Sequence, residues 1–156
     1  MEKVPPEPPK LSPDRIEERL FYIDEQVAIL RRLRDEPGLL EALPKDKLDY
    51  GGALYALQSA IQAMIDIAFH VCAKLYLRAP ENSAEAFELL AEKGELPDDF
   101  LPSIREMVNF RNLVVHGYLH TKTGVVMQII RENLDDFTVW RRLVDGMLRR
   151  NGARER

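Results

Sequence analysis

Residues 56–75, ALQSAIQAMIDIAFHVCAKL, decide the fold, because they describe a long helix that is apolar over much of its surface. Apolar side chains recur there at steps of three and four residues, which is the period of an α-helix packed into a core. The pattern spans about 45–79, and Pro80 stops it. This length exceeds that of an ordinary globular helix and indicates a long bundle helix. Gly51-Gly52 is a weak point where the helix could kink.

A second long helix is expected before this one, over about 13–36. Ser12-Pro13 is a typical helix start, with serine as the N-cap and proline in the first turn. Pro37-Gly38 ends the helix. One face is apolar at helical spacing, and it comprises Ile16, Leu20, Ile23, Val27, Leu30 and Leu33. Residues 1–12 are rich in proline, so we expect a flexible lead-in without helix.

Two further helices are expected in the middle of the chain. Ser83 is expected to cap a short helix over 84–93, which Gly94 closes. A longer helix is expected to begin near Pro97 and to break at Gly117.

The last helix is expected to begin near Val125, after a polar turn over 121–124, and to continue to about residue 150. The segment GVVMQII at its start also allows a strand, but helix is favoured. The sequence therefore predicts an all-α fold, an up-and-down bundle of four to five helices. We expect one domain over 13–150 and a flexible tail over 151–156.

Composition restricts the function classes. Cys72 is the only cysteine, which excludes an intrachain disulfide and a cysteine-based zinc site. His70, His116 and His120 do not form a recognised metal-binding spacing, so no cofactor is expected. No stretch approaches the ~20 apolar residues of a membrane span, and the N-terminus lacks the apolar run of a signal peptide. We therefore expect a cytoplasmic protein without membrane contact.

The charge is unevenly distributed along the chain. The formal net charge is −4, and residues 103–156 contribute ten Lys or Arg and six Asp or Glu, which gives +4. Residues 1–102 therefore carry −8. The overall sign argues mildly against broad, charge-driven binding of nucleic acid, whereas the basic C-terminal third leaves room for a local site.

The segment NFRNLVVHGY, residues 109–118, concentrates the groups suited to chemistry. Arg111 and Tyr118 are two turns apart on one face of a helix, and Asn112 and His116 are an i,i+4 pair. Arg111 and His116 are about 140° apart around the axis. These two side chains converge only if the helix unwinds near Gly117 or if a second copy of the chain contributes.

These groups suit metal-free RNA cleavage. A histidine can transfer protons to and from the reacting oxygens, and an arginine can stabilise charge on the phosphate. One histidine per chain is meagre for two proton transfers, and a two-fold dimer would supply two. From spacing alone, the alternative is that Arg111 is a helix-end cation and His116 a capping residue.

The segment RNLVVHGY resembles the Arg-x4-His-x-Tyr signature of the HepT-like HEPN proteins, and the long helix over 56–75 resembles the family's long helix. The similarity covers about 13–148. The resemblance implies a homodimeric ribonuclease toxin of a type VII toxin–antitoxin system, partnered with an MntA-like nucleotidyltransferase antitoxin. It implies that Arg111 stabilises the scissile phosphate, that His116 transfers protons and that the antitoxin adds AMP to Tyr118.

Several residues have two interpretations. Asp66 and His70 are an i,i+4 pair that could form a polar wall facing Arg111, or a structural pair. Asn112 could orient the phosphate or the motif histidine. His120 is expected to be a surface residue. We expect Gln58 and Gln62 to lie at a dimer interface. We expect Phe137 and Trp140 to lie in the core.

A rival function belongs to another class. The same bundle could be a non-catalytic subunit that docks a separate nucleotidyltransferase and helps it to hold nucleotide or substrate. The acidic net charge and the single motif histidine per chain suit this alternative better than they suit catalysis.

Overall fold

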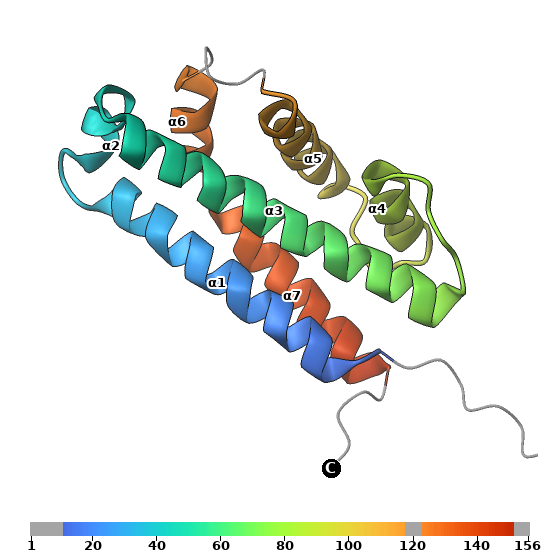
Figure 1. Ribbon diagram of the computed structural model, residues 1–156. Helices are drawn as coiled ribbons and strands as arrows, with labels where there is room; N and C mark the ends of the chain where they lie inside the picture. The colour runs from blue at the N-terminus through green and yellow to red at the C-terminus, as the bar shows by residue number, and fades with distance from the viewer. Residues whose placement is uncertain (1–10, 118–122, 152–156) are drawn as a thin grey trace, which may run out of the picture.

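A computed structural model describes residues 11–117 and 123–151, so Tyr118 and His120 lie outside the described residues. The described residues are predominantly helical and include no strand, which confirms the all-α prediction. Figure 1 shows the helices, which are α1 (Pro13–Asp35), α2 (Leu39–Ala42), a 3-10 turn η1 (Leu43–Lys45), α3 (Lys47–Tyr76), α4 (Ser83–Glu92), α5 (Leu101–Val115), α6 (Thr123–Glu132) and α7 (Asp135–Arg150).

Helices α1 and α3 form the spine of the bundle and run antiparallel beside one another (Figure 1). The first turn of α3 is capped by Asp46, whose Oδ1 accepts the backbone N–H groups of Leu48 and Asp49, each at 3.0 Å. The helix continues through Gly51-Gly52 without interruption. Burial on several sides of α3 stabilises this glycine-containing helix through tertiary packing.

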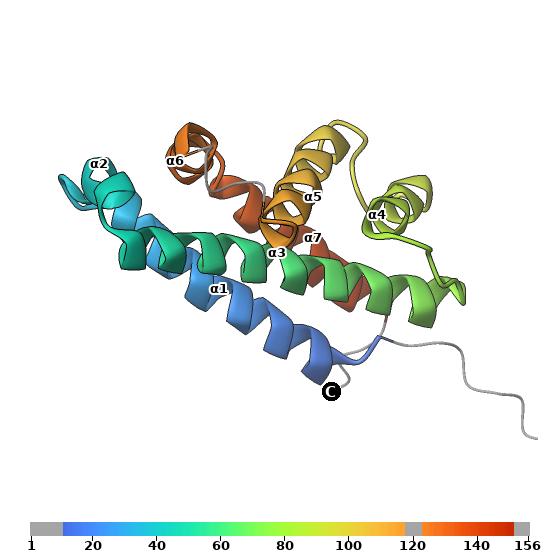
Figure 2. The same cartoon turned by 45° about the horizontal axis from the view of Figure 1, so that its top comes forward.

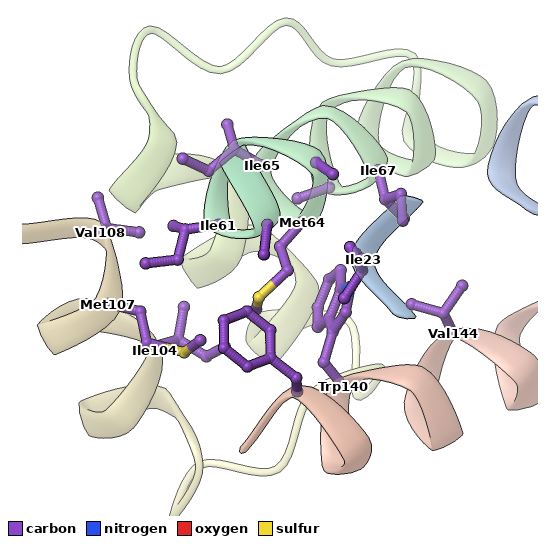
Figure 3. Close-up of a cluster of buried hydrophobic side chains, with 14 of the residues drawn as sticks. Ile23, Ile61, Met64, Ile65, Ile67, Ile104, Met107, Val108, Trp140 and Val144 are labelled. Atoms are coloured by element: carbon purple, nitrogen blue, oxygen red, sulfur yellow. The ribbon is translucent and has the colours of Figure 1, made fainter. Parts of the chain in front are cut away.

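The helices α4, α5 and α6 lie on one side of α3, and α7 lies near α1 (Figure 2). Side chains from four helices meet in the core that Figure 3 draws: Ile23 from α1, Ile61, Met64, Ile65 and Ile67 from α3, Ile104, Met107 and Val108 from α5, and Trp140 and Val144 from α7. Trp140 is fully buried and meets the ring of Phe87 edge-on, with centroids 5.4 Å apart. The prediction that Trp140 and Phe137 belong to the core is confirmed.

The prediction of one continuous last helix is wrong, because the chain forms α6 and α7 with a break between them. The backbone N–H of Asn133 still bonds to the carbonyl of Ile129, whereas the N–H of Asp136 bonds to Asn133. Leu134 lies between the two helices and is buried, 1% exposed. The acidic first turn of α7, at Asp135 and Asp136, suits the positive end of a new helix dipole.

Two other local predictions also need correction. Asn82, and not Ser83, caps α4: its Oδ1 accepts the N–H of Glu85 at 2.8 Å. The segment between α1 and α3 forms α2 and η1, where the sequence predicted no helix. Their short turns bury Leu40 and Leu43 against the bundle.

Among the described helices, α3 is long and apolar enough to cross a membrane, which the sequence reading did not anticipate. Of its most apolar window, 67% is buried inside the bundle. A core helix covered by neighbouring helices satisfies the same criteria of length and composition.

Candidate functional site

Helix α5 positions the motif at its C-terminal end. Buried side chains, including Met107, Val108 and Phe110, fix one side of α5 to the bundle. The helix ends where the sequence predicted, because Gly117 adopts φ +76 and its N–H bonds to the carbonyl of Val114 at 3.0 Å. A side chain at this left-handed position would be strained, so Gly117 suits the point where the chain leaves the helix.

Arg111 is half-buried and already oriented. Its Nη1 donates to Oδ1 of Asn112 at 3.1 Å. Its Nε is buried and has no acceptor within the part of the chain that the structure describes. A buried guanidinium N–H without an acceptor is costly, and a phosphate or carboxylate oxygen would satisfy it. The pair of Arg111 and Asn112 is therefore suited to receiving an anion.

His116 is exposed at the end of α5, where its backbone N–H bonds to the carbonyl of Asn112 at 3.1 Å. Helix α5 is continuous up to Val115, and His116 is its C-cap residue. At 100° per residue, the two side chains leave the axis about 140° apart. One copy of the motif thus presents its cation and its imidazole on different sides of the helix.

The structure places Asp66 against α1. Its Oδ1 accepts from Nε2 of Gln62 at 3.0 Å, and its Oδ2 lies 3.8 Å from Nε of Arg19. Both partially exposed carboxylate oxygens therefore face groups other than His70. The expected Asp66–His70 pair is not formed among the described residues, because the amide one turn earlier and the arginine across the interface are available.

His70 also faces α1, and it binds the start of that helix. Its Nε2 accepts the backbone N–H of Ser12 at 3.1 Å, so this nitrogen is unprotonated. Partial burial, together with the charges of Arg15 and Lys74, lowers the pKa of His70 below its usual value. Ser12 occupies the predicted N-cap position, but its side chain makes no capping hydrogen bond there.

Asp66 and His70 therefore line a polar pocket of about 600 Å³ between α1 and α3, together with Arg15 and Arg19. No described interaction joins either residue to Arg111. Each residue therefore has a separate structural contact with α1 or α3, and a catalytic role for either one stays a prediction.

A second pocket, of about 380 Å³, lies between α5, α6 and α7. Its polar lining includes Glu106, Asn109 and Asp136, none of which the sequence singled out. Glu106 and Asn109 lie three residues apart on α5, and this helical spacing is the one feature of the sequence that could have indicated the pocket. The third reaches the pocket only because the chain breaks before α7. Within 11–117 and 123–151, no cluster of histidine, cysteine, aspartate or glutamate is arranged to hold a metal ion.

Comparison with known proteins gives consistent results. The model of the family described as "Ribonuclease HepT-like" matches residues 23–141. A curated relative, the mRNA nuclease HepT of Shewanella oneidensis, is 32% identical over 81 residues, which are 52% of this chain and 61% of the relative. The match thus spans less than two thirds of that relative's length.

Solved structures share the fold. The tri-AMPylated Shewanella oneidensis HEPN toxin in complex with MNT antitoxin superposes with a TM-score of 0.77 at 22% identity, covering 85% of this chain and 98% of that one. YutE from Bacillus subtilis, a cytosolic protein of unknown function, superposes with a TM-score of 0.80 at 12% identity, covering 95% and 98%. At these identities the likeness establishes the fold.

Proposed function

This chain belongs to the ribonuclease HepT-like family, and we propose that it is the toxin of a HepT/MntA-like toxin–antitoxin pair and cuts RNA without a metal ion. The observation that carries the proposal is the state of Arg111 at the end of α5. This side chain is held by Asn112 and keeps a buried N–H donor without an acceptor. A scissile phosphate supplies the acceptor oxygens that this donor lacks.

The proposed reaction is a transesterification. The RNA 2′-oxygen loses its proton and forms a bond to the adjacent phosphorus, while the bond from phosphorus to the 5′-oxygen breaks and that oxygen gains a proton. The products are a cyclic 2′,3′-phosphate and a 5′-hydroxyl. Arg111 stabilises the charge on the phosphate oxygens, and His116 transfers a proton. Asn112 is a positioning residue that acts through Arg111.

A homodimer completes this site in our proposal. One chain carries a single motif histidine, about 140° around a regular helix from Arg111, whereas two copies related by a two-fold axis supply two of each group to one cleft. The antitoxin is proposed to be a nucleotidyltransferase that adds AMP to Tyr118. Because Tyr118 is two residues beyond His116 in the chain, an anionic adduct on it would obstruct the same cleft. A related toxin is described as AMPylated and bound to its antitoxin.

The test is RNA cleavage by the purified chain in the presence of EDTA. We expect cleavage by the wild type and losses of at least about a hundredfold for Arg111→Ala and His116→Ala, which is the usual scale for removing a charge-stabilising or proton-transferring group. Arg105→Ala is the matched control, because Arg105 lies on α5 outside the motif and only approaches Glu88, at 3.6 Å. Undiminished cleavage by both motif variants would reject the assignment of the site.

The alternative is a non-catalytic subunit that docks a nucleotidyltransferase and helps it hold nucleotide. The net charge of −4 and the single motif histidine favour it. Nucleotide binding without any cleavage in the same experiment would support this alternative over the toxin.

A further inference from the structure

The pocket between α5, α6 and α7 has the properties of a small-ligand site. Its volume of about 380 Å³ falls within the range of roughly 300–1,000 Å³ that is typical of such sites. Phe110, Ile129 and Phe137 contribute apolar walls, and Leu113 stands at its edge with 36% of its surface exposed. Leu57 and Ile61 of α3 also line the pocket. Helices α5 and α6 lie on the same side of α3 (Figure 2). An apolar, flat ligand would find both burial and ring contacts here.

The polar lining of this pocket combines two carboxyl groups with one hydroxyl and three amide side chains. Glu106 and Asp136 place two carboxyl groups in its lining, and no lysine, arginine or histidine is among the described lining residues. The carboxyl group of Asp136 has a raised pKa, chiefly because of burial; a hydrogen bond with the side chain of Asn133 opposes this effect, and the nearby charges of Asp135 and Glu106 add to it. Two carboxyl groups without a cation favour a ligand that offers N–H donors, and they repel a phosphate.

Amide groups add directional hydrogen bonding around these carboxyl groups. Asn109 and Gln128 both line the pocket, and Nε2 of Gln128 donates to Oε2 of Glu132 at 3.4 Å. Carboxylate and carboxamide groups are the side chains that pair with the amino-bearing edges of nucleobases. The lining thus combines apolar walls for a ring with acceptors for its amino group.

The pocket also lies on the same side of α5 as His116. Leu113 is three residues before His116, and Asn109 is seven residues before it, so the three residues share one face of the helix. Arg111 leaves the helix on another side. A ligand seated between Asn109 and Leu113 would therefore lie next to the proposed proton-transferring group.

We propose that this pocket is a base-recognition subsite that takes a nucleobase carrying an exocyclic amino group in preference to uracil. The amino group of adenine, cytosine or guanine donates to the carboxyl groups, whereas the O4 of uracil would face them acceptor to acceptor. The inference rests on the proposed function, in which the base belongs to the nucleotide at the cut. The same chemistry would also receive the base of a free mononucleotide, and the experiments below separate these two sources.

The first experiment measures cleavage of oligonucleotides that differ only in the base beside the cut. We expect the wild type to cut after an amino-bearing base about tenfold faster than after uracil, the usual scale of one good side-chain–base pairing. Glu106→Gln and Asp136→Asn replace an acceptor oxygen by an N–H donor, so we expect both to remove most of this preference. Asp135→Asn is the matched control: it removes the adjacent charge, and Asp135 does not line the pocket.

The second experiment measures binding of AMP, CMP, GMP and UMP, and of an uncleavable 2′-deoxy oligonucleotide, to the Arg111→Ala protein by NMR. We expect amino-bearing bases to shift the pocket signals more than UMP does, and Leu113→Trp, which fills the pocket edge, to abolish the shifts. If Glu106→Gln weakens binding of the mononucleotides alone, the subsite belongs to free nucleotide. If it weakens binding of both the mononucleotides and the oligonucleotide, the subsite belongs to RNA.

The outcomes of the two experiments are distinct. If RNA is never cut but amino-bearing nucleotides bind in a manner that Glu106→Gln weakens, the subsite stands and the proposed ribonuclease function fails. If all bases are cut and bound equally, the inference is overturned while the function stands. It is equally overturned if Asp136→Asn and Glu106→Gln only weaken docking of a basic segment of a partner protein.

Discussion

His70 joins the two spine helices through one hydrogen bond that depends on its protonation state. Its unprotonated Nε2 accepts the N–H of Ser12, which is at the start of α1. A free N–H at a helix start needs an acceptor, and the imidazole of α3 supplies it. Protonation would replace that acceptor by a second donor and set an imidazolium beside the positive charges of Arg15 and Lys74.

We therefore predict that His70 makes folding stability depend on pH. The folded-state pKa of His70 is lowered from 6.5, so at a pH between the two values the unfolded chain binds more protons than the folded one. The free energy of unfolding should fall as the pH drops through about 6.5 toward the folded-state pKa. Urea unfolding of the wild type and of His70→Gln, which keeps an acceptor, should show this loss only in the wild type. A constant difference between the two proteins at every pH would contradict the prediction.

Cys72 provides a second test at the scale of one residue. Its side chain is fully buried between α3 and α4, and its Sγ donates to the carbonyl of Ala86 at 3.5 Å. Burial raises the pKa of the thiol to about 11. Because the thiolate is the nucleophile, iodoacetamide at about pH 8 should label the native protein far more slowly than the protein in urea. Equal rates in the two conditions would show that α3 and α4 separate readily.

The sequence identified the motif residues more readily than their surroundings. The spacing of Arg111, His116 and Tyr118 is a local pattern, and local patterns are visible in one chain. The partners of Asp66 are different, because Arg19 approaches it only once α1 packs on α3. The contribution of Asp136 to the second pocket also depends on tertiary structure, whereas the helical spacing of Glu106 and Asn109 was visible in the sequence.

At the scale of the helix, α4 offers a direct comparison of two neighbouring caps. Asn82 accepts the N–H of Glu85, whereas Ser83 is already the first residue of the helix. Asn82→Ala should therefore lower the free energy of unfolding by about 1 kcal/mol, and Ser83→Ala should change it much less. Urea denaturation of the two variants measures the difference. A larger loss of unfolding free energy for Ser83→Ala than for Asn82→Ala would show that Ser83 is the N-cap, as the sequence alone predicted.

Helix existence was more predictable than helix boundaries. The periodic apolar faces of α1, α3 and α5 identified these elements, because burial requires one face of each helix to be apolar. The break at Leu134 was missed for the same reason: this leucine fits the apolar period of a continuous helix. Leu134 is buried between α6 and α7 because the chain turns there against the bundle. The spacing of apolar residues along the sequence does not reveal such a turn.

At the scale of the whole molecule, the direction of two side chains requires more than one chain in the proposed mechanism. On a regular helix Arg111 and His116 are about 140° apart, so the helix geometry of one motif does not favour directing both at the same phosphate. A two-fold related copy could place the arginine of one protomer near the histidine of the other. Within such a dimer, either single variant removes one kind of group from both protomers.

Mixing the two inactive variants tests this arrangement. When Arg111→Ala and His116→Ala subunits are unfolded together and refolded, about half of the dimers should be mixed, and each mixed dimer keeps one arginine and one histidine on different chains. If one arginine and one histidine acting in trans suffice for cleavage and the two pairs act independently, RNA cleavage should return to about a quarter of the wild-type rate, since half of the dimers regain one of two pairings. Refolding each variant alone is the control and should stay inactive. A mixture as inactive as its parents, with mixed dimers verified by mass spectrometry, would contradict cleavage by a single arginine–histidine pair acting in trans.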